Sequence, residues 1–257
     1  MSGKKVIAVS NEKGGTGKTT TSVNLAAVFT NFGNRVLLID SDPQMNATSS
    51  LGCNGCNECN YADVLTDSKA VSECIVNTDY CDLIPASSRL GVAEKILAAE
   101  GNHYRLAEVL ESIDDYDYVI IDCPPRMDEL VRNAFVAATD VIIPMSTSSY
   151  SMDGLLMVNS TIRMVQKYEN PKLRINGLLC QMFDDRTNLA GEVKNVLKEI
   201  AGKLNTQVYG TAIHRMINAD VATHRHMPLV AYAPKCKTSK EYFNLAMEVA
   251  YHAHADY

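Results

Sequence analysis

Residues 13–20 read KGGTGKTT and stand between an apolar run at 6–9 (VIAV) and an amphipathic run at 23–29 (VNLAAVF). This order predicts a strand, a tight loop and a helix, which is the arrangement that a nucleotide phosphate site requires. The glycines let successive backbone N–H groups turn toward one anion. Lys18 supplies a positive charge to the β- and γ-phosphates, and the Thr19 hydroxyl is a ligand for Mg²⁺. The stretch therefore predicts a site for a nucleoside triphosphate.

The loop departs from the common P-loop sequence at its start. Glu12 stands where the first glycine usually lies, and a second lysine, Lys13, precedes Gly14. This deviant Walker A sequence resembles that of the ParA/MinD group of P-loop ATPases. The resemblance implies that Lys13 reaches across a dimer interface to the nucleotide of the partner subunit. The residues expected to bind ATP in this loop are Lys13, Gly14, Gly15, Thr16, Gly17, Lys18, Thr19 and Thr20.

Two other apolar runs end in carboxylates, at residues 36–44 (VLLIDSDPQ) and 118–125 (YVIIDCPP). Alternate residues of an extended chain face the same side, so Asp40 and Asp42 can both face the phosphate loop. Taken alone, they fit equally well as caps of a following helix. The family resemblance implies that Asp42 orients the attacking water and that Asp40 lies near the magnesium shell. It also implies that Asp122 is the Walker B aspartate, which holds Mg²⁺ through water.

Two C-terminal segments, 185–187 (DRT) and 213–215 (IHR), resemble family segments near the nucleotide base and the DNA-facing surface. The resemblance implies that His214 and Arg215 contact ATP. The chain also departs from the family here, because the family usually has proline at position 214, and proline and glycine at positions 223 and 226. The closest resemblance over residues 4–250 is to ParA/Soj-type partition ATPases.

Apolar runs alternate with segments of helical period along the chain. The runs lie at 5–10, 35–40, 81–85, 117–122, 139–144, 173–181 and 207–213. Such alternation predicts an α/β fold with one doubly wound, mostly parallel sheet flanked by helices, and with nucleotide at the carboxyl ends of the strands. We expect residues 1–257 to form a single P-loop ATPase domain with a variable loop at about 44–60. We also expect a long helix at 150–168, with an apolar face formed by Leu155, Leu156, Val158, Ile162, Met164 and Val165.

Length and composition agree with this fold. A chain of 257 residues, 46% hydrophobic and 21% charged, is long enough to bury one large core. It has no apolar stretch of twenty residues, and its first residues, MSGKK, lead directly into a predicted strand. Neither a transmembrane helix nor a secretory signal is therefore predicted. We expect a cytoplasmic, nucleoid-associated protein that does not bind membranes.

The loop at 44–60 contains Cys53, Cys56 and Cys59. Their spacing resembles the first three ligands of a bacterial iron–sulfur run, and thiolates so spaced also hold zinc. No fourth cysteine follows at the required short spacing. Cysteines of a cytoplasmic chain are expected to be thiols rather than a disulfide framework. We expect a variable loop without metal, and a metal site stays the alternative.

The charge distribution indicates a possible partner. The chain carries a net charge of −6, yet residues 194–240 contain eight basic residues and two acidic ones. Such a region attracts phosphate backbones even when the whole chain is acidic; the alternative is an ordinary solvated surface. The residues expected to bind DNA are Arg215, Arg225, Lys235, Lys237 and Lys240.

Together these motifs predict an ATP hydrolase with ATP and Mg²⁺ as cofactors. The predicted catalytic residues are Lys13, Lys18 and Asp42. The predicted metal ligands are Thr19, Asp40 and Asp122. By the family resemblance, the homodimer formed on ATP binding binds DNA non-specifically, and a ParB-like activator triggers hydrolysis. The cargo, whether chromosome, plasmid or mobile element, stays open.

Other classes of ATPase remain alternatives. A MinD-like positioning ATPase needs a basic amphipathic C-terminal helix, whereas residues 242–251 (YFNLAMEVAY) read as a packing helix. An iron-protein-like or iron–sulfur scaffold ATPase would use cysteines at its dimer interface. A small-molecule ligase of the same superfamily would turn over without DNA or a protein activator.

Overall fold

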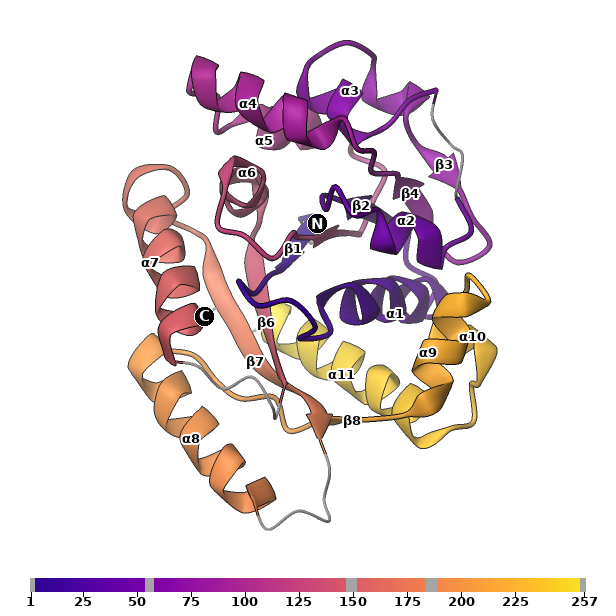
Figure 1. The fold of residues 1–257 in the computed structure, drawn as a ribbon, viewed down its shortest axis with the longest axis vertical. Coiled ribbons are helices and arrows are strands. Elements are labelled where there is room, and N and C mark those ends of the chain that lie inside the picture. Colours follow the sequence, from indigo (N-terminus) through magenta and orange to yellow (C-terminus); the bar gives the residue numbers. More distant parts are fainter. Residues whose placement is uncertain (1–2, 54–57, 147–151, 184–188, 255–257) are drawn as a thin grey trace.

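The computed structural model describes residues 3–53, 58–146, 152–183 and 189–254 (Figure 1). Within them, one eight-stranded sheet has the order β3-β4-β2-β5-β1-β6-β7-β8. The strands are β1 (Lys5–Val9), β2 (Val36–Asp40), β3 (Val76–Asn77), β4 (Asp82–Ile84), β5 (Tyr118–Asp122), β6 (Asp140–Ser146), β7 (Arg174–Phe183) and β8 (Ile213–His214). The only antiparallel pairing of these strands joins β3 to β4. The predicted mostly parallel sheet is confirmed.

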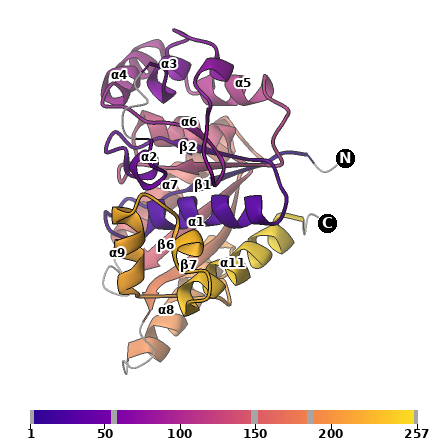
Figure 2. The ribbon, with the colours of Figure 1, turned by 90° about the vertical axis from the view of Figure 1, so that its right-hand side faces the viewer.

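Helices cover both faces of the sheet (Figures 1 and 2). One hydrophobic core lies beneath α3 (Tyr61–Leu65), α4 (Leu90–Glu100), α5 (Arg105–Glu111), α6 (Glu129–Ala137), α7 (Met152–Tyr168) and α8 (Leu189–Leu204). The other core lies beneath α1 (Lys18–Asn31), α2 (Asn46–Ser50), α9 (Ile217–His224), α10 (Leu229–Tyr232) and α11 (Lys237–His254). The sheet is therefore doubly wound, as predicted.

The central strands place the predicted motifs side by side. Every residue of β2 and β5 is buried, because apolar side chains from both faces of these strands pack against helices. Asp122, the last residue of β5, is in register with Val9 at the end of β1 and with Asp40 at the end of β2. The carboxyl ends of three adjacent strands therefore meet at one level of the sheet.

The long helix predicted at 150–168 is confirmed from Met152 to Tyr168, and residues 150 and 151 lie outside the described part of the chain. Its apolar face is narrower than predicted. Leu156 and Met164 are exposed, because they lie beside the buried stripe of the helix. The buried stripe consists of Leu155, Val158, Ile162 and Val165.

The last helix packs as predicted from residues 242–251. In α11 the side chains of Tyr242, Leu245, Ala246 and Val249 are buried, and α11 lies against α1. Among the described residues, no helix combines the length and the apolar character needed to span a bilayer.

Two predicted segments differ from the structure. The loop expected at 44–60 contains the short helix α2, because Thr48 is tied to Asp40 by two hydrogen bonds. The strand expected at 207–213 is reduced to an isolated bridge at Val208 and the two residues of β8. Between these, the N–H groups of residues 210 and 211 donate to the Glu248 carboxylate of α11, so the chain leaves the sheet there.

Candidate functional site

The phosphate loop joins β1 to α1. Gly15 and Gly17 have positive φ angles of 70° and 86°, a conformation that glycine adopts without strain. A Cβ atom on Gly17 would also lie 3.0 Å from the side chain of Gln181. Lys18 is buried, and its Nζ donates to the carbonyl oxygen of Lys13 at 2.9 Å. Burial lowers the pKa of Lys18, and Asp122 opposes this effect.

The loop is anchored on both sides. The side chain of Asn11 accepts from the N–H of Lys13 at 3.1 Å and donates to the carbonyl oxygen of Pro144 at 2.7 Å. On the helix side, Gln181 donates to the Thr21 hydroxyl at 2.6 Å, and Thr21 donates to the carbonyl oxygen of residue 17 at 2.7 Å. The hydrogen bonds of Asn11, which follows β1, and of Gln181, in β7, thus fix the two ends of the phosphate loop.

Asp40 and Asp42 have different surroundings. Asp40 Oδ2 accepts from the Thr48 N–H and hydroxyl at 2.8 and 2.7 Å, and Oδ1 accepts from the N–H of Asp42 at 3.1 Å. Asp42 is also buried, and its Oδ1 accepts from the N–H of Gln44 at 2.9 Å. Asp40 therefore fixes the turn that carries Asp42, while Asp42 faces the cavity described below.

Asp122 is fully buried at the end of β5. Its Oδ1 accepts from the Ser22 hydroxyl at 2.9 Å, but Oδ2 accepts no hydrogen bond from the described residues. Burial, and next the charge of Asp40, raise the pKa of Asp122, while the hydroxyls of Thr19 and Ser22 oppose this rise. A buried carboxylate oxygen without a donor, close to Thr19, fits a hydrated Mg²⁺ ion.

A cavity of about 370 Å³ opens beside the phosphate loop. Its phosphate wall comprises residues 14–20, and the cavity is also lined by Val23, Asn24, Asp42, Gln44, Asn46, Ser50 and Pro125. Its other wall is largely apolar and consists of Met182, Ala219, Ala222, Thr223, Met227, Pro228 and Leu229. The volume suits a small ligand, and the walls suit a ligand with a charged end and a flat apolar end.

The apolar wall of the cavity is made of other residues than the two that were predicted to contact the nucleotide base, His214 and Arg215. Neither His214 nor Arg215 is among the residues that line the cavity. The His214 Nδ1 and Glu241 Oε1 atoms are 2.6 Å apart, and the His214 N–H also donates to Glu241 at 2.9 Å. Arg215 is exposed. Glu241 thus holds this segment toward α11, and residues 185–187 lie outside the described residues.

The sequence contained one signal for the apolar wall, the run MPLV at 227–230. His226, just before it, has a φ of 55°, and its Nδ1 lies 2.7 Å from the carbonyl oxygen of Ser49. Glycine adopts this left-handed conformation with less strain than histidine. Thr223 lines the cavity.

Comparisons with known proteins agree with this geometry. A family model described as an AAA domain matches residues 4–175. The sporulation initiation inhibitor protein Soj of Bacillus subtilis is 41% identical over 251 residues, covering 96% of this chain and 98% of that protein. The chain belongs to the ParA/Soj family of partition ATPases. The chromosome partitioning protein ParA of Myxococcus xanthus is 36% identical over 250 residues, covering 95% of this chain and 87% of that protein.

A protein of known structure that is named as a synthase has the same fold as this ParA/Soj family member. Cobyrinic acid a,c-diamide synthase from Mycobacterium smegmatis superposes with a TM-score of 0.85 at 33% identity, covering 98% of this chain and 96% of that one. That synthase has been solved with ADP and magnesium, and with an ATP analogue and magnesium. The fold therefore accommodates an adenine nucleotide and its metal in a relative.

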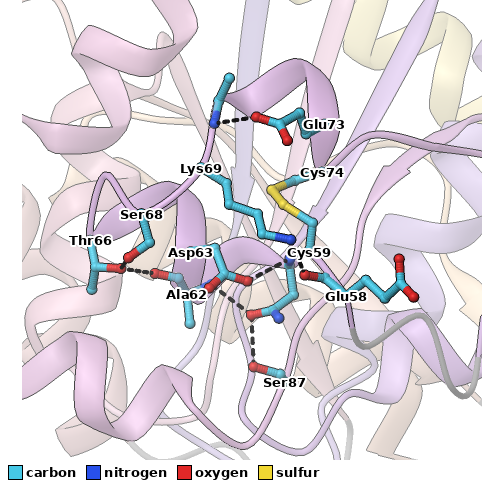
Figure 3. Close-up of a disulfide and its surroundings, with 12 residues drawn as sticks. Glu58, Cys59, Ala62, Asp63, Thr66, Ser68, Lys69, Glu73, Cys74 and Ser87 are labelled. Atoms are coloured by element: carbon cyan, nitrogen blue, oxygen red, sulfur yellow. Dashed lines mark hydrogen bonds between the residues drawn. A yellow bond between two sulfur atoms is a disulfide. The ribbon is translucent and has the colours of Figure 1, made fainter.

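The cysteines of this ParA/Soj chain correct one prediction. Cys59 and Cys74 form a disulfide with their Cα atoms 4.7 Å apart (Figure 3), so these two are not the thiols expected. Asn60 caps α3 directly after Cys59, and this places Cys59 against the end of the 3₁₀ helix at Val71–Glu73. Cys53 packs in the core beneath α1, on the opposite face of the sheet from Cys59.

Two of the three cysteines that a metal site in this loop would need, Cys53 and Cys59, lie in cores on opposite faces of the sheet. Cys56 lies outside the described residues, and within them no group of three or more His, Cys, Asp and Glu side chains has the arrangement of a metal site. Cys123 is a packed residue: it is 1% exposed, and burial raises the pKa of its thiol.

The basic residues of segment 194–240 lie on two faces of the molecule. Lys198 and Lys203 are on α8, which covers one core, and Lys203 pairs with Glu199 at 2.8 Å. The five residues predicted to bind DNA lie on or beside α9–α11, over the other core, and all five are exposed. They are Arg215, Arg225, Lys235, Lys237 and Lys240. Helix α8 therefore does not contribute to this second group, which we call the α9–α11 basic face.

Proposed function

We propose that this chain binds ATP and Mg²⁺, forms a homodimer when ATP is bound, binds DNA without sequence preference, and partitions DNA with the help of a ParB-like activator. The observation that carries the proposal is that the buried carboxylate of Asp42 lines the same cavity as the phosphate loop. A carboxylate in that position can orient water for attack on a phosphoryl group. We place the protein in the cytoplasm, at the nucleoid.

The phosphate wall fits a triphosphate with its metal. The exposed backbone of Gly14 and Gly15 offers N–H groups to an anion, and the Lys18 ammonium lies at the same wall. Thr19 and the donor-free Oδ2 of Asp122 fit the metal shell. A bound Mg²⁺ would neutralise charge on the phosphate oxygens. In this proposal Asp40 lies near the shell and acts through the turn that it holds.

Lys13 is proposed to act on the nucleotide of the partner subunit. Its N–H and carbonyl group are engaged by Asn11 and Lys18 within its own subunit, and the residue is not among those lining its own cavity. The loop beside it is open to solvent at Gly14 and Gly15, so a second subunit can approach. A lysine brought in this way would stabilise negative charge as the phosphoryl group is transferred.

The α9–α11 basic face is the proposed DNA surface. Its five side chains are exposed, and Lys237 lies 3.9 Å from the carboxylate of Glu241. Exposed cations on one face suit a phosphate backbone. Because α9 and α10 also form the apolar wall of the cavity, the proposed nucleotide and DNA sites share these helices.

A small-molecule ligase is the second candidate, because the synthase from Mycobacterium smegmatis is 33% identical. ATP turnover separates the two functions. A partition ATPase should hydrolyse ATP slowly alone and faster when DNA and a ParB-like protein are both added. Turnover that ignores DNA and activator, and rises only with an amide donor and a small carboxylic acid, would favour the ligase. We expect neither the MinD-like nor the iron–sulfur alternative.

A further inference from the structure

A buried amide in α1 connects the two walls of the cavity. Asn24 is 2% exposed, lies one turn after the phosphate loop and lines the cavity, but both polar atoms of its side chain are bonded to backbone groups. Its Nδ2 donates to the carbonyl oxygen of Thr20 at 2.8 Å, and its Oδ1 accepts from the N–H of Val230 at 3.0 Å. Thr20 belongs to the phosphate wall, and Val230 directly follows Pro228 and Leu229 of the apolar wall. One side chain therefore holds both walls.

The bond to Val230 replaces a helix cap. Helix α10 has only four residues, and its N-cap, Pro228, has no side chain able to accept a hydrogen bond. The first N–H groups of any helix lack partners within the helix. Asn24 supplies the missing acceptor from another helix, in the manner of an N-cap asparagine. So short a helix has little stability of its own, and its position depends on such contacts.

A second side chain contacts both ends of α10. The Ser239 hydroxyl lies 3.3 Å from the carbonyl oxygen of Leu229 and 2.8 Å from that of Ala233. Ser239 belongs to α11, which packs against α1, so its bonds hold α10 relative to the phosphate loop only indirectly. Of these two contacts, only the hydrogen bond of Asn24 joins α10 to α1, the helix that begins at the phosphate loop.

We propose that Asn24 is a positioning residue that sets the separation of the phosphate and apolar walls, and thereby the contribution of the nucleotide base to binding. This inference rests on the proposed ATP site. Without Asn24 the phosphate wall keeps its own anchors at Asn11 and Gln181. The apolar wall, in contrast, loses the bond that fixes its distance from the loop. Base affinity should fall while affinity for the bare phosphate chain is retained.

The test compares Asn24→Leu with Asn133→Leu. Asn133 is a matched control, because it is fully buried and joins two segments through Asn102 and Leu106 on the opposite face of the sheet. Dissociation constants for ATP and for inorganic tripolyphosphate, both with Mg²⁺, are measured by competition against a fluorescent ATP analogue. Asn24→Leu should weaken the binding of ATP about tenfold, because the Val230 N–H loses its acceptor. It should change the dissociation constant of tripolyphosphate less than about twofold. Asn133→Leu should leave the ratio of the two constants unchanged.

A second variant covers the case in which Asn24→Leu does not fold. Ser239→Ala loosens the same wall from the side of α11 and should also weaken ATP more than tripolyphosphate. Equal weakening of both ligands by the folded variants, or no weakening, would overturn the role of Asn24 while leaving the ATP site intact. A parent protein that binds ATP no better than tripolyphosphate would overturn the proposed base site itself, and the role of Asn24 with it.

Discussion

Asp42, after β2, and Lys13, after β1, have different proposed roles at the same nucleotide site. Asp42 is buried in the cavity of its own subunit, and its carboxylate is oriented by the N–H of Gln44. Lys13 has its backbone fixed but lies outside the lining of that cavity. Loss of Asp42 should therefore affect chemistry within a subunit, and loss of Lys13 should affect assembly.

We predict opposite effects on the dimer from these two residues. Lys13→Ala should still bind ATP through Lys18, but should lose the ATP-dependent dimer and about 100-fold of the hydrolysis rate. Asp42→Ala should lose a similar share of hydrolysis but keep the dimer, because the nucleotide contacts remain. Light scattering with ATP and a phosphate-release assay measure the two effects, with Lys95→Ala on α4 as the control. Complete dimerisation of Lys13→Ala would exclude its role.

Asp122 gives a prediction about pH. Burial raises its pKa above the ordinary 3.8, so the folded protein binds this proton more tightly than the unfolded chain does. The contribution to stability is present at low pH and is lost as pH rises through the folded pKa. Asp122→Asn should therefore unfold at a higher temperature than the ligand-free parent at pH 8, with a smaller difference at pH 5. One pKa unit corresponds to about 1.4 kcal/mol, or about 2–4 °C in a chain of this size.

The control for this comparison is Asp79→Asn, at an exposed position, which should follow the parent at both pH values. A melting temperature of Asp122→Asn that stays below that of the parent at pH 8, in the absence of nucleotide and Mg²⁺, would contradict the raised pKa.

At the scale of elements, the sequence predicted what depends on local pattern. Strands β1, β2 and β5 are apolar runs buried on both faces, and such runs are visible without knowing their neighbours. Helix α2 and the break before β8 depend on Thr48 meeting Asp40 and on Glu248 meeting a distant backbone. Long-range side-chain contacts of this kind have no period in the sequence, so these two elements were missed.

The disulfide supplies a prediction at the same scale. It closes a separation of 15 residues between α3 and the following 3₁₀ helix, a loop for which chain entropy gives about 3 kcal/mol. Cys59→Ser and Cys74→Ser should each lower the free energy of unfolding by up to that amount. The free energy of unfolding of the double variant should be no lower than that of the less stable single variant, since each change breaks the same bond.

Chemical denaturation with and without reductant measures this effect. Reductant should destabilise the parent but leave Cys59→Ser unchanged. If reductant leaves the free energy of unfolding of the parent unchanged, whether the protein was prepared with or without oxygen, the disulfide does not form in solution.

At the scale of the whole molecule, the sequence predicted that the strands preceding the phosphate loop and the carboxylates end at one edge of the sheet, because parallel strands bring their carboxyl ends together. Of the three predicted carboxylates, only Asp42 lines the cavity with the phosphate loop. The sequence did not place the apolar wall. Met182 and residues 219–229 come from β7, α9 and α10, which meet only in three dimensions. The sequence also could not show which basic residues of segment 194–240 share a face of the molecule. Lys198 belongs to this segment but lies on the opposite face of the sheet from Lys240.

The most direct test of partition by this ATPase is DNA affinity as a function of salt, with ATP and Mg²⁺ and without nucleotide. The parent with ATP should bind unrelated duplexes equally, and weakly without nucleotide. Changing Lys235, Lys237 and Lys240 together to Glu should weaken binding to every duplex and reduce the salt slope by about 2.7 for each subunit that contacts DNA, because each neutralised phosphate contributes about 0.9. The same charge change at Lys172, Lys198 and Lys203 should have little effect. Failure of the parent to bind DNA with ATP at low salt would contradict the central claim.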